Sequence, residues 1–253
     1  MLLFEGGNIW PDVETNFDPS VIGKPLSQTT QQYLKPLGVI LEVIGSCWKP
    51  RYDSNGDAVK SNDLDSMVEL TTLMQYFKTD DPSVVRKSLA AFLNKQNIET
   101  KLTGVTVHAR IPLNGKFYQA DIKVVKNAAK VAQFHRHEIP QGSPYKGVNK
   151  QMMMNALASS QGMLWSPDEG LYKRDASGKK SELLSDEWDQ IAKYLLGKQA
   201  SGKDLGSVES IINAIPDKNR KEEIYNLAKN SRSWQSSTPT VTEWFRRTLD
   251  ILK

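Results

Sequence analysis

Two acidic residues separated by one position, Asp63 and Asp65, have the clearest chemical potential in this 253-residue chain. They open a segment that alternates as a β-strand, so both carboxylates lie on one face while Leu64 lies on the other. Carboxylates placed so closely raise each other's pKa and cost stability unless a cation neutralises them. By itself this spacing is more often a pair of exposed strand acids than a cation site. The Gly45-Ser46 turn before the pair and an acid after it change the balance in favour of a cation.

A third carboxylate comes from Asp121, which lies in the segment Tyr118 to Val125, an expected strand of the same sheet. Magnesium is a hard divalent ion that prefers oxygen ligands. Three carboxylates on neighbouring strands would hold two such ions roughly 3.5–4 Å apart, the geometry for in-line displacement at phosphorus. Asp63, Asp65 and Asp121 are therefore the candidate metal ligands and catalytic residues. The expected cofactor is two Mg²⁺ (or Mn²⁺) ions.

An apolar strand from Val39 to Ile44 ends in a Gly45-Ser46 turn before these acids. A strand, a Gly-Ser turn, an Asp-x-Asp strand and a later acid, in that order, resemble the nucleotidyltransferase superfamily typified by DNA polymerase beta. The resemblance implies that Gly45 and Ser46 contact triphosphate oxygens. Lys49 lies where polymerases of this family place a phosphate-binding Arg.

The same resemblance assigns roles to the acids. Asp63 and Asp65 would each touch both metals. Asp121 would bind the catalytic metal and help to activate the attacking hydroxyl.

Later residues resemble the nucleotide-selecting subdomain of family X polymerases, so the resemblance covers roughly residues 27–197. It is carried by Gly142-Ser143, by a helix beginning at Asn149, by the stretch Gly162 to Tyr172, and by an acidic closing helix up to Leu196. It implies that Gly142 and Ser143 help to bind the nucleotide and that Asn149 contacts the incoming base or sugar.

The chain also departs from the family at specific positions. Met152-Met153-Met154 occupies the region of a template-sensing Arg, and Gln119 replaces an Arg two residues before the third acid. The loop between Ser46 and Asp63 is longer than usual, and nothing N-terminal resembles the lyase domain of repair polymerases. The resemblance thus implies nucleotidyl transfer more directly than templated gap repair.

The elements expected around the site give an α+β fold. A nucleotidyltransferase palm, with a mixed or antiparallel sheet and flanking helices, precedes a small thumb-like α/β subdomain and a helical tail. The expected palm helices cover 27–34 and 81–96, and its strands cover 39–44, 63–70, 98–102, 105–113 and 117–125, with a hairpin turn at Asn114-Gly115.

After Lys126 the pattern becomes helical with loops. A helix is expected over 149–160, a hairpin over 171–180, a helix over 185–196, a Gly/Lys/Ser linker over 197–206, and three helical pieces beyond. The predicted division is an irregular segment at 1–26, the palm at 27–130, the thumb-like subdomain at 131–197 and the helical extension at 198–253.

Positive charge is concentrated in the middle of the chain. The whole chain has a net charge of +4, whereas residues 116–180 alone have +6. This favours a phosphate-rich partner, although a solvated basic face would give the same count. The expected partners are a nucleoside triphosphate and nucleic acid, DNA before RNA. The candidate nucleic-acid contacts are Lys123, Lys146, Lys150, Lys173 and Arg174.

The composition excludes several classes of protein. Hydrophobic residues make up 39% and charged residues 25%, and no apolar run approaches the roughly 20 residues that span a bilayer. The acidic N-terminus does not resemble a secretory signal. Cys47 is the single cysteine, so no internal disulfide is possible, which suits a reducing, cytoplasmic compartment.

The expected function is therefore metal-dependent transfer of a nucleotide from a nucleoside triphosphate to a 3′-hydroxyl, by a family X-like DNA polymerase or terminal transferase. One alternative is a nucleotidyltransferase that acts on RNA, a protein or a small molecule, as in toxin-like members. Another is a non-catalytic nucleotidyltransferase fold that binds DNA or serves in assembly.

Overall fold

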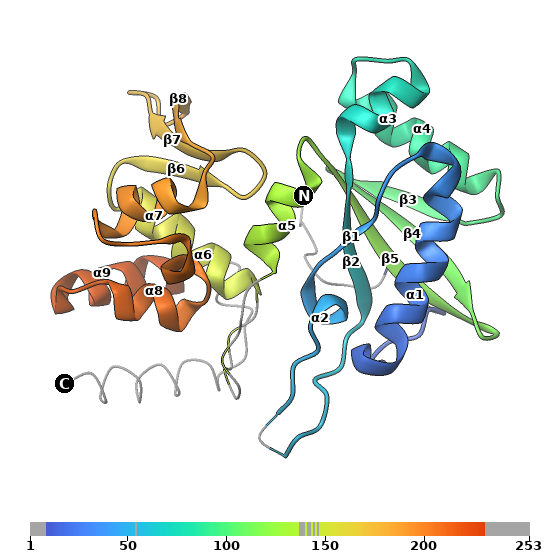
Figure 1. Ribbon diagram of the computed structural model, residues 1–253, viewed down its shortest axis with the longest axis horizontal. Coiled ribbons are helices and arrows are strands. Elements are labelled where there is room, and N and C mark those ends of the chain that lie inside the picture. The colour runs from blue at the N-terminus through green and yellow to red at the C-terminus, as the bar shows by residue number, and fades with distance from the viewer. Residues whose placement is uncertain are drawn as a thin grey trace. The chain divides into compact units, whose positions relative to one another are not determined.

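The computed structural model describes residues 9–53, 55–136, 140, 143, 145 and 147–230, and the chain divides into two compact units after Arg136 (Figure 1). The first unit holds the Gly-Ser turn and the three predicted catalytic acids. Residues 131–136, expected to open the thumb-like subdomain, belong to this first unit instead. None of the helices in the described ranges has the length and apolar character needed to span a membrane.

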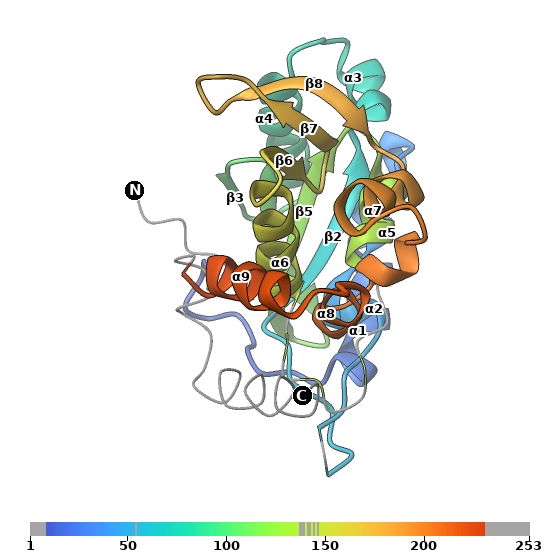
Figure 2. The same ribbon diagram turned by 90° about the vertical axis from the view of Figure 1, so that its left-hand side faces the viewer.

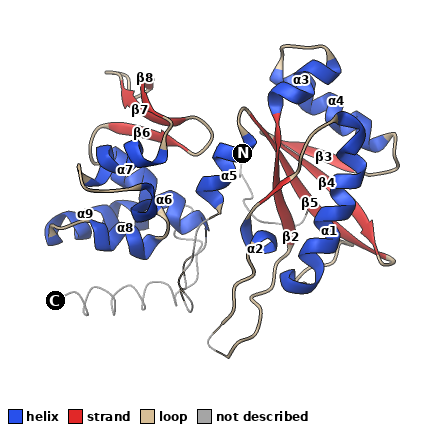
Figure 3. Ribbon diagram, viewed as in Figure 1, coloured by secondary structure: helices blue, strands red, loops and turns tan. Residues whose placement is uncertain are grey.

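Five strands form a mixed sheet in the first unit, in the order β1-β2-β5-β4-β3 (Figure 3). β2 and β5 pair in parallel, and the other neighbours pair antiparallel. The expected α+β class with a mixed sheet is confirmed. The strands are β1 (Glu42–Val43), β2 (Asp63–Glu69), β3 (Thr100–Thr103), β4 (Thr106–Leu113) and β5 (Lys116–Val125).

The hairpin between β4 and β5 fixes the register on which the site depends. Asn114 and Gly115 have φ values of 52° and 76°, the left-handed conformations that a two-residue type I′ turn requires. Leu113 therefore pairs with Lys116, and counting back along both strands places His108 opposite Asp121.

α1 (Pro19–Leu34) and α4 (Pro82–Asn94) cover one face of this sheet. The helical elements of the first unit are α1 (Pro19–Leu34), η1 (Lys35–Leu37), α2 (Gly45–Trp48), α3 (Leu70–Phe77), α4 (Pro82–Asn94) and α5 (Ala128–His135). α1 and α4 pack against β4. Leu64, Val107 and Ile122 contribute fully buried side chains to the core beneath them.

α1 begins earlier than the sequence suggested. A helix was expected only from Ser27, with residues 1–26 irregular, but α1 starts at Pro19. The Asp18 side chain accepts a hydrogen bond from Ser20 N at 2.8 Å, and Pro19 occupies the first helical position, where proline is well tolerated. The expected helix at Asp81-Pro82 is confirmed with the same arrangement, because Asp81 caps α4 through Ser83 N.

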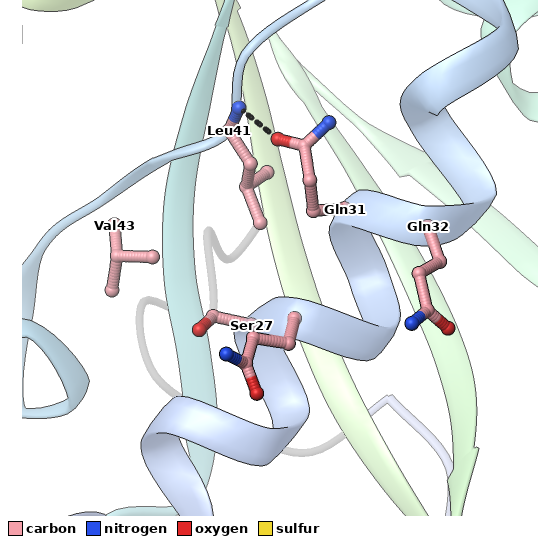
Figure 4. A pocket seen from close by; sticks show the side chains of 6 residues that line it. Ser27, Gln31, Gln32, Leu41 and Val43 are labelled. Carbon is pink, nitrogen blue, oxygen red and sulfur yellow. Dashed lines mark hydrogen bonds between the residues drawn. The ribbon is translucent and has the colours of Figure 1, made fainter.

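The strand expected over residues 39–44 shortens to the two residues of β1 because a side chain replaces a strand partner. Gln31 of α1 donates to Val39 O at 2.9 Å and accepts from Leu41 N at 2.6 Å (Figure 4). These bonds satisfy the backbone that a longer strand would have paired. Beside them lies a pocket that contains none of the predicted site residues and is lined by Ser27, Gln28, Gln31, Gln32, Leu41 and Val43.

α5 packs on the other face of the sheet, near β1 and β2. Met67 and Val131 belong to a second, smaller core cluster there. The Glu69 carboxylate accepts from Ala128 N at 2.8 Å, close to the start of α5. Arg136, after the helix end, forms an ion pair with Glu42. These contacts hold the C-terminal end of the first unit against β1 and β2.

The second unit joins a three-stranded antiparallel sheet to helices. α6 lies between this sheet and the pair α8 and α9 (Figures 1 and 2). The expected helix at 149–160 and the expected hairpin at 171–180 are confirmed. The elements are α6 (Gly147–Ser159), β6 (Met163–Ser166), β7 (Gly170–Arg174), β8 (Lys180–Ser185), α7 (Trp188–Leu196), η2 (Gly202–Leu205), α8 (Val208–Ala214) and α9 (Lys218–Lys229).

The sequence predicted a helical extension from residue 198, and residues 198–230 fall in the same compact unit as α6 and α7. α8 and α9 pack on α6 within the same compact unit. The expected linker at 197–206 contains a capped turn, in which Ser201 and Asp204 bond reciprocally and Leu205 is buried. The remainder of the expected helical tail, residues 231–253, lies outside the described residues.

Candidate functional site

The parallel pairing of β2 with β5 brings the predicted acids together. Asp65 pairs with Asp121 and Asp63 pairs with Gln119. Because neighbouring residues in register point to the same side of a sheet, all three carboxylates lie on one face, and Leu64 lies in the core on the other. This face is the one opposite α1 and α4.

Burial, together with repulsion between the carboxylates, disturbs the protonation of two of these acids. Burial raises the pKa of Asp63 to about 8, with smaller contributions from the negative charges of Asp65 and Asp121. Burial also raises the pKa of Asp65, and Asp121 adds to this effect, while the positive charge of Lys123 opposes it. Charge is therefore costly on this face, as expected for a site that a cation completes.

Asp121 is held by two donors on a single oxygen. His108 Nδ1 lies 2.7 Å from Asp121 Oδ1, and Gln119 Nε2 donates to the same oxygen at 2.9 Å. Each donor has an outer partner. Thr103 Oγ1 lies 2.5 Å from His108 Nε2, and Ile9 N donates to Gln119 Oε1 at 2.8 Å.

The predicted Gly-Ser turn lies directly against Asp65. Ile44 N donates to Asp65 O at 3.0 Å, which brings the next residue, Gly45, beside the Asp65 side chain. Gly45 has a φ of +64°, and a Cβ atom there would lie 3.0 Å from Asp65 Oδ2. Glycine is thus required twice, for backbone conformation and for close approach.

Ser46 and Asp63 are linked through a third residue. Ser46 Oγ donates to Ser61 Oγ at 2.7 Å, and Ser61 Oγ donates to Asp63 O at 3.0 Å. The turn and the Asp-x-Asp strand are therefore joined by side chains at the point where the long loop between them returns to the sheet.

The donor set suits a hard divalent cation, although the acids are not already gathered around one point. Within the described residues, no three His, Cys, Asp or Glu side chains lie in an arrangement that could hold a metal ion. Asp121 instead bonds to His108 and Gln119. Each of the three carboxylates makes the negative charge of the others less favourable. Carboxylate oxygens are also the ligands that Mg²⁺ prefers.

One predicted basic contact of the first unit, Lys123, lies close to the acids. Lys123 Nζ is 4.0 Å from Asp65 Oδ1, and its side chain is 31% exposed. It is therefore a counter-charge to the acids, a role that the sequence did not indicate. Lys49 is exposed immediately after α2.

Most of the predicted nucleotide-binding and nucleic-acid-binding residues of the second unit are buried or are bonded to other residues of that unit. Ser143 is 6%, Asn149 0% and Lys150 2% exposed, so Lys150 does not present the exposed ammonium that a phosphate contact needs. Lys173 bonds to Glu182 at 2.7 Å, and Arg174 donates to Met163 O and Ser159 Oγ. Gly142 and Lys146 lie outside the described residues.

Sequence reasoning missed His108, Thr103 and the contact that Ile9 makes. The signal for His108 was present, since a two-residue turn at Asn114-Gly115 sets the register that puts it opposite Asp121. Thr103 and Ile9 depend on how separate segments return to the sheet, which no local pattern indicates.

No protein-family model and no curated protein sequence matches this chain. Among solved structures, it is similar to the structure of a cytoplasmic RNA terminal U-transferase, with a TM-score of 0.28 and 15% sequence identity. The match covers 58% of this chain and 50% of that chain, so this chain spans about half of that chain's length.

Proposed function

We propose that this protein is a metal-dependent nucleotidyltransferase, which transfers a nucleotide from a nucleoside triphosphate to a hydroxyl group. The observation that carries the proposal is the in-register placement of Asp65 and Asp121 on adjacent parallel strands, with Gly45 against Asp65. Together with the order of these residues in the sequence, it supports a palm of this superfamily.

In this proposal the chain supplies the binding groups and a proton acceptor. Asp63, Asp65 and Asp121 would hold Mg²⁺ or Mn²⁺, which when bound neutralises negative charge on the phosphates. The backbone at Gly45, the Ser46 hydroxyl and the Lys49 ammonium would hold the triphosphate. The Ser46 hydroxyl is bonded to Ser61, and the Ser61 hydroxyl is bonded to the backbone of Asp63 in the Asp-x-Asp strand.

The transfer itself exchanges a phosphoanhydride bond of the triphosphate for a phosphoester bond to the acceptor. The acceptor oxygen forms a bond to the α-phosphorus as the bond from that phosphorus to the bridging oxygen breaks, and pyrophosphate leaves. Asp121 accepts the proton of the attacking hydroxyl. In its most specific form, the proposal takes the 3′-hydroxyl of DNA as the acceptor, as the family X resemblance implies, in a reducing cytoplasmic compartment.

The test is a transfer assay with Mg²⁺ or Mn²⁺ and each labelled nucleoside or deoxynucleoside triphosphate in turn. DNA and RNA oligonucleotides, with and without a template strand, serve as acceptors. We expect elongation by the wild type and none by the Asp63→Asn and Asp65→Asn variants. A wild type that transfers nothing and is not stabilised by metal and triphosphate together would overturn the proposal in favour of a non-catalytic fold.

A further inference from the structure

The third acid is fixed by a two-layered set of hydrogen bonds that the superfamily pattern did not predict. His108 of β4 and Gln119 of β5 both donate to Asp121 Oδ1. His108 is only 8% and Gln119 only 1% exposed. Buried donors of this kind restrict the carboxylate to one orientation, because rotating it would leave two polar groups unsatisfied.

The outer layer sets which ring nitrogen of His108 carries the proton. A carboxylate accepts, so the proton shared with Asp121 lies on Nδ1. In the neutral ring, His108 Nε2 is then the acceptor for the Thr103 hydroxyl, 2.5 Å away on the neighbouring strand β3. Thr103 thereby selects the tautomer that can donate to Asp121, as outer hydrogen-bond partners do for catalytic and metal-binding histidines.

We propose that His108 is a positioning residue of the active site, oriented by Thr103, and that it commits one oxygen of Asp121 so that the other serves the metal and the attacking hydroxyl. This role rests on the proposed function. Orientation matters here because Asp121 is needed at an angle that suits both partners, and a small misplacement of a reacting group costs much of the rate.

The position of His108 distinguishes this role from that of Lys123. Lys123 approaches the site as a cation, 4.0 Å from Asp65, where it opposes the binding of another cation. His108 instead meets Asp121 through a hydrogen bond of 2.7 Å from a ring that is itself held by Thr103. Its contribution is therefore to the orientation of the carboxylate.

The experiment compares His108→Leu, which removes the donor, with His108→Asn, whose amide can still donate near the position of Nδ1. Thr103→Val removes the outer hydroxyl and Thr103→Ser keeps it. Thr106→Val, a buried change on the strand of His108, is the matched control. Thermal unfolding of each variant first establishes that it folds.

We expect His108→Leu to lower kcat about 10–100-fold while the KM for the triphosphate changes little. His108→Asn should recover most of this loss. Thr103→Val should lower kcat by a smaller factor, Thr103→Ser should restore it, and Thr106→Val should leave it unchanged. Equal losses in Thr103→Val and Thr106→Val, or none in His108→Leu, would overturn the proposal.

Two readouts do not need turnover. Nitrogen-15 spectra of the His108 ring should show the proton on Nδ1 in the wild type and a mixture of tautomers in Thr103→Val. Mn²⁺ titration should show about tenfold weaker binding in His108→Leu than in the wild type. A wild type that never transfers a nucleotide would defeat the proposed function alone. Indistinguishable Mn²⁺ titrations of wild type and His108→Leu would defeat the positioning role.

Discussion

Asp65 and Asp121 lie opposite each other on adjacent parallel strands, where burial raises the pKa of Asp65 and the charge of Asp121 raises it further. Neighbouring strands are only about 4.8 Å apart, so the fold brings two like charges together that the sequence keeps far apart. Such an arrangement is destabilising in the absence of a cation. Function, and not stability, is the natural reason to keep it.

Replacing Asp121 by Asn should separate catalysis from stability. The change keeps the shape and the hydrogen-bond acceptor for His108, while it removes one of the charges that raise the pKa of Asp63. Without metal, Asp121→Asn should be more stable than the wild type, with a free energy of unfolding that is higher by on the order of 1 kcal/mol. With metal, transfer should fall on the order of a hundredfold or more while triphosphate binding largely survives.

Thermal unfolding with and without Mg²⁺, together with the transfer assay, checks this prediction. Asp57→Asn, which neutralises an exposed acid in the long loop, is the control and should change neither stability nor transfer. Equal transfer rates for Asp121→Asn and the wild type would show that this carboxylate is not part of the reaction.

The close approach of Gly45 to Asp65 can be tested against a glycine with the same backbone conformation. Gly45 has φ +64° and Gly38 has φ +69°, but only at Gly45 would an added Cβ meet a neighbour, Asp65 Oδ2 at 3.0 Å. Gly38→Ala should cost about 1 kcal/mol for the left-handed conformation alone. Gly45→Ala should cost more and should also weaken triphosphate binding.

Denaturant unfolding and triphosphate titration of both variants make the comparison. If the two alanine substitutions destabilise equally and neither weakens triphosphate binding, Gly45 shapes the backbone turn and has no part in binding the triphosphate. A loss of binding confined to Gly45→Ala would support its place against the phosphates.

The centre of the palm could be predicted because local rules agree there. The alternation at Asp63 and Asp65 fixes their common face, and the Asn114-Gly115 turn fixes the β4–β5 register. Both are short-range consequences of sequence. The same register also places His108 opposite Asp121, so its position is a consequence of the hairpin turn.

The edges of the palm could not be predicted in the same way. β1 is short because Gln31, on a helix, bonds to Val39 and Leu41. Residues 9–17 make contacts with residues distant in sequence, such as the bond from Trp10 to Glu99 at 2.8 Å. Tertiary contacts of this kind override local propensity and leave no periodic signal.

Lys123 should act as a built-in counter-charge that a metal ion makes unnecessary. Its positive charge lowers the pKa of both Asp63 and Asp65. Lys123→Met should therefore raise these pKa values further and lower the unfolding temperature at mildly alkaline pH without metal. The gain in unfolding temperature on adding Mg²⁺ should be larger than in the wild type, because the cation then neutralises more unbalanced charge.

Lys126→Met is the matched control, since Lys126 is exposed just beyond the end of β5. Thermal shifts over a series of Mg²⁺ concentrations give the comparison. If Mg²⁺ raises the unfolding temperature of Lys123→Met and Lys126→Met by the same amount, Lys123 does not neutralise the charges that the metal ion neutralises.

Lys150 should make the stability of the protein depend on alkaline pH. Burial lowers the pKa of Lys150 to about 7, from 10.5, although its ammonium lies 5.8 Å from the centroid of the Trp188 ring, a contact that favours the charged form. Between these two values the unfolded chain binds a proton that the folded chain does not. Stability therefore rises as pH increases from about 7 towards 10.5, and below about 7 the cost is fully present.

Lys150→Met removes this titration and keeps a side chain of similar length, so it should be more stable than the wild type at pH 7, by on the order of a few kcal/mol. The difference should shrink steadily as pH rises towards 10.5 and level off above it, where the folded and the unfolded wild type are both neutral at this position. Lys193→Met, an exposed change on α7, controls for the general titration of lysines, and its stability should follow that of the wild type at every pH.

Urea unfolding of the three proteins across this pH range gives their free energies of unfolding. A constant difference between Lys150→Met and the wild type would mean that packing, and not the buried charge, sets the stability at this position.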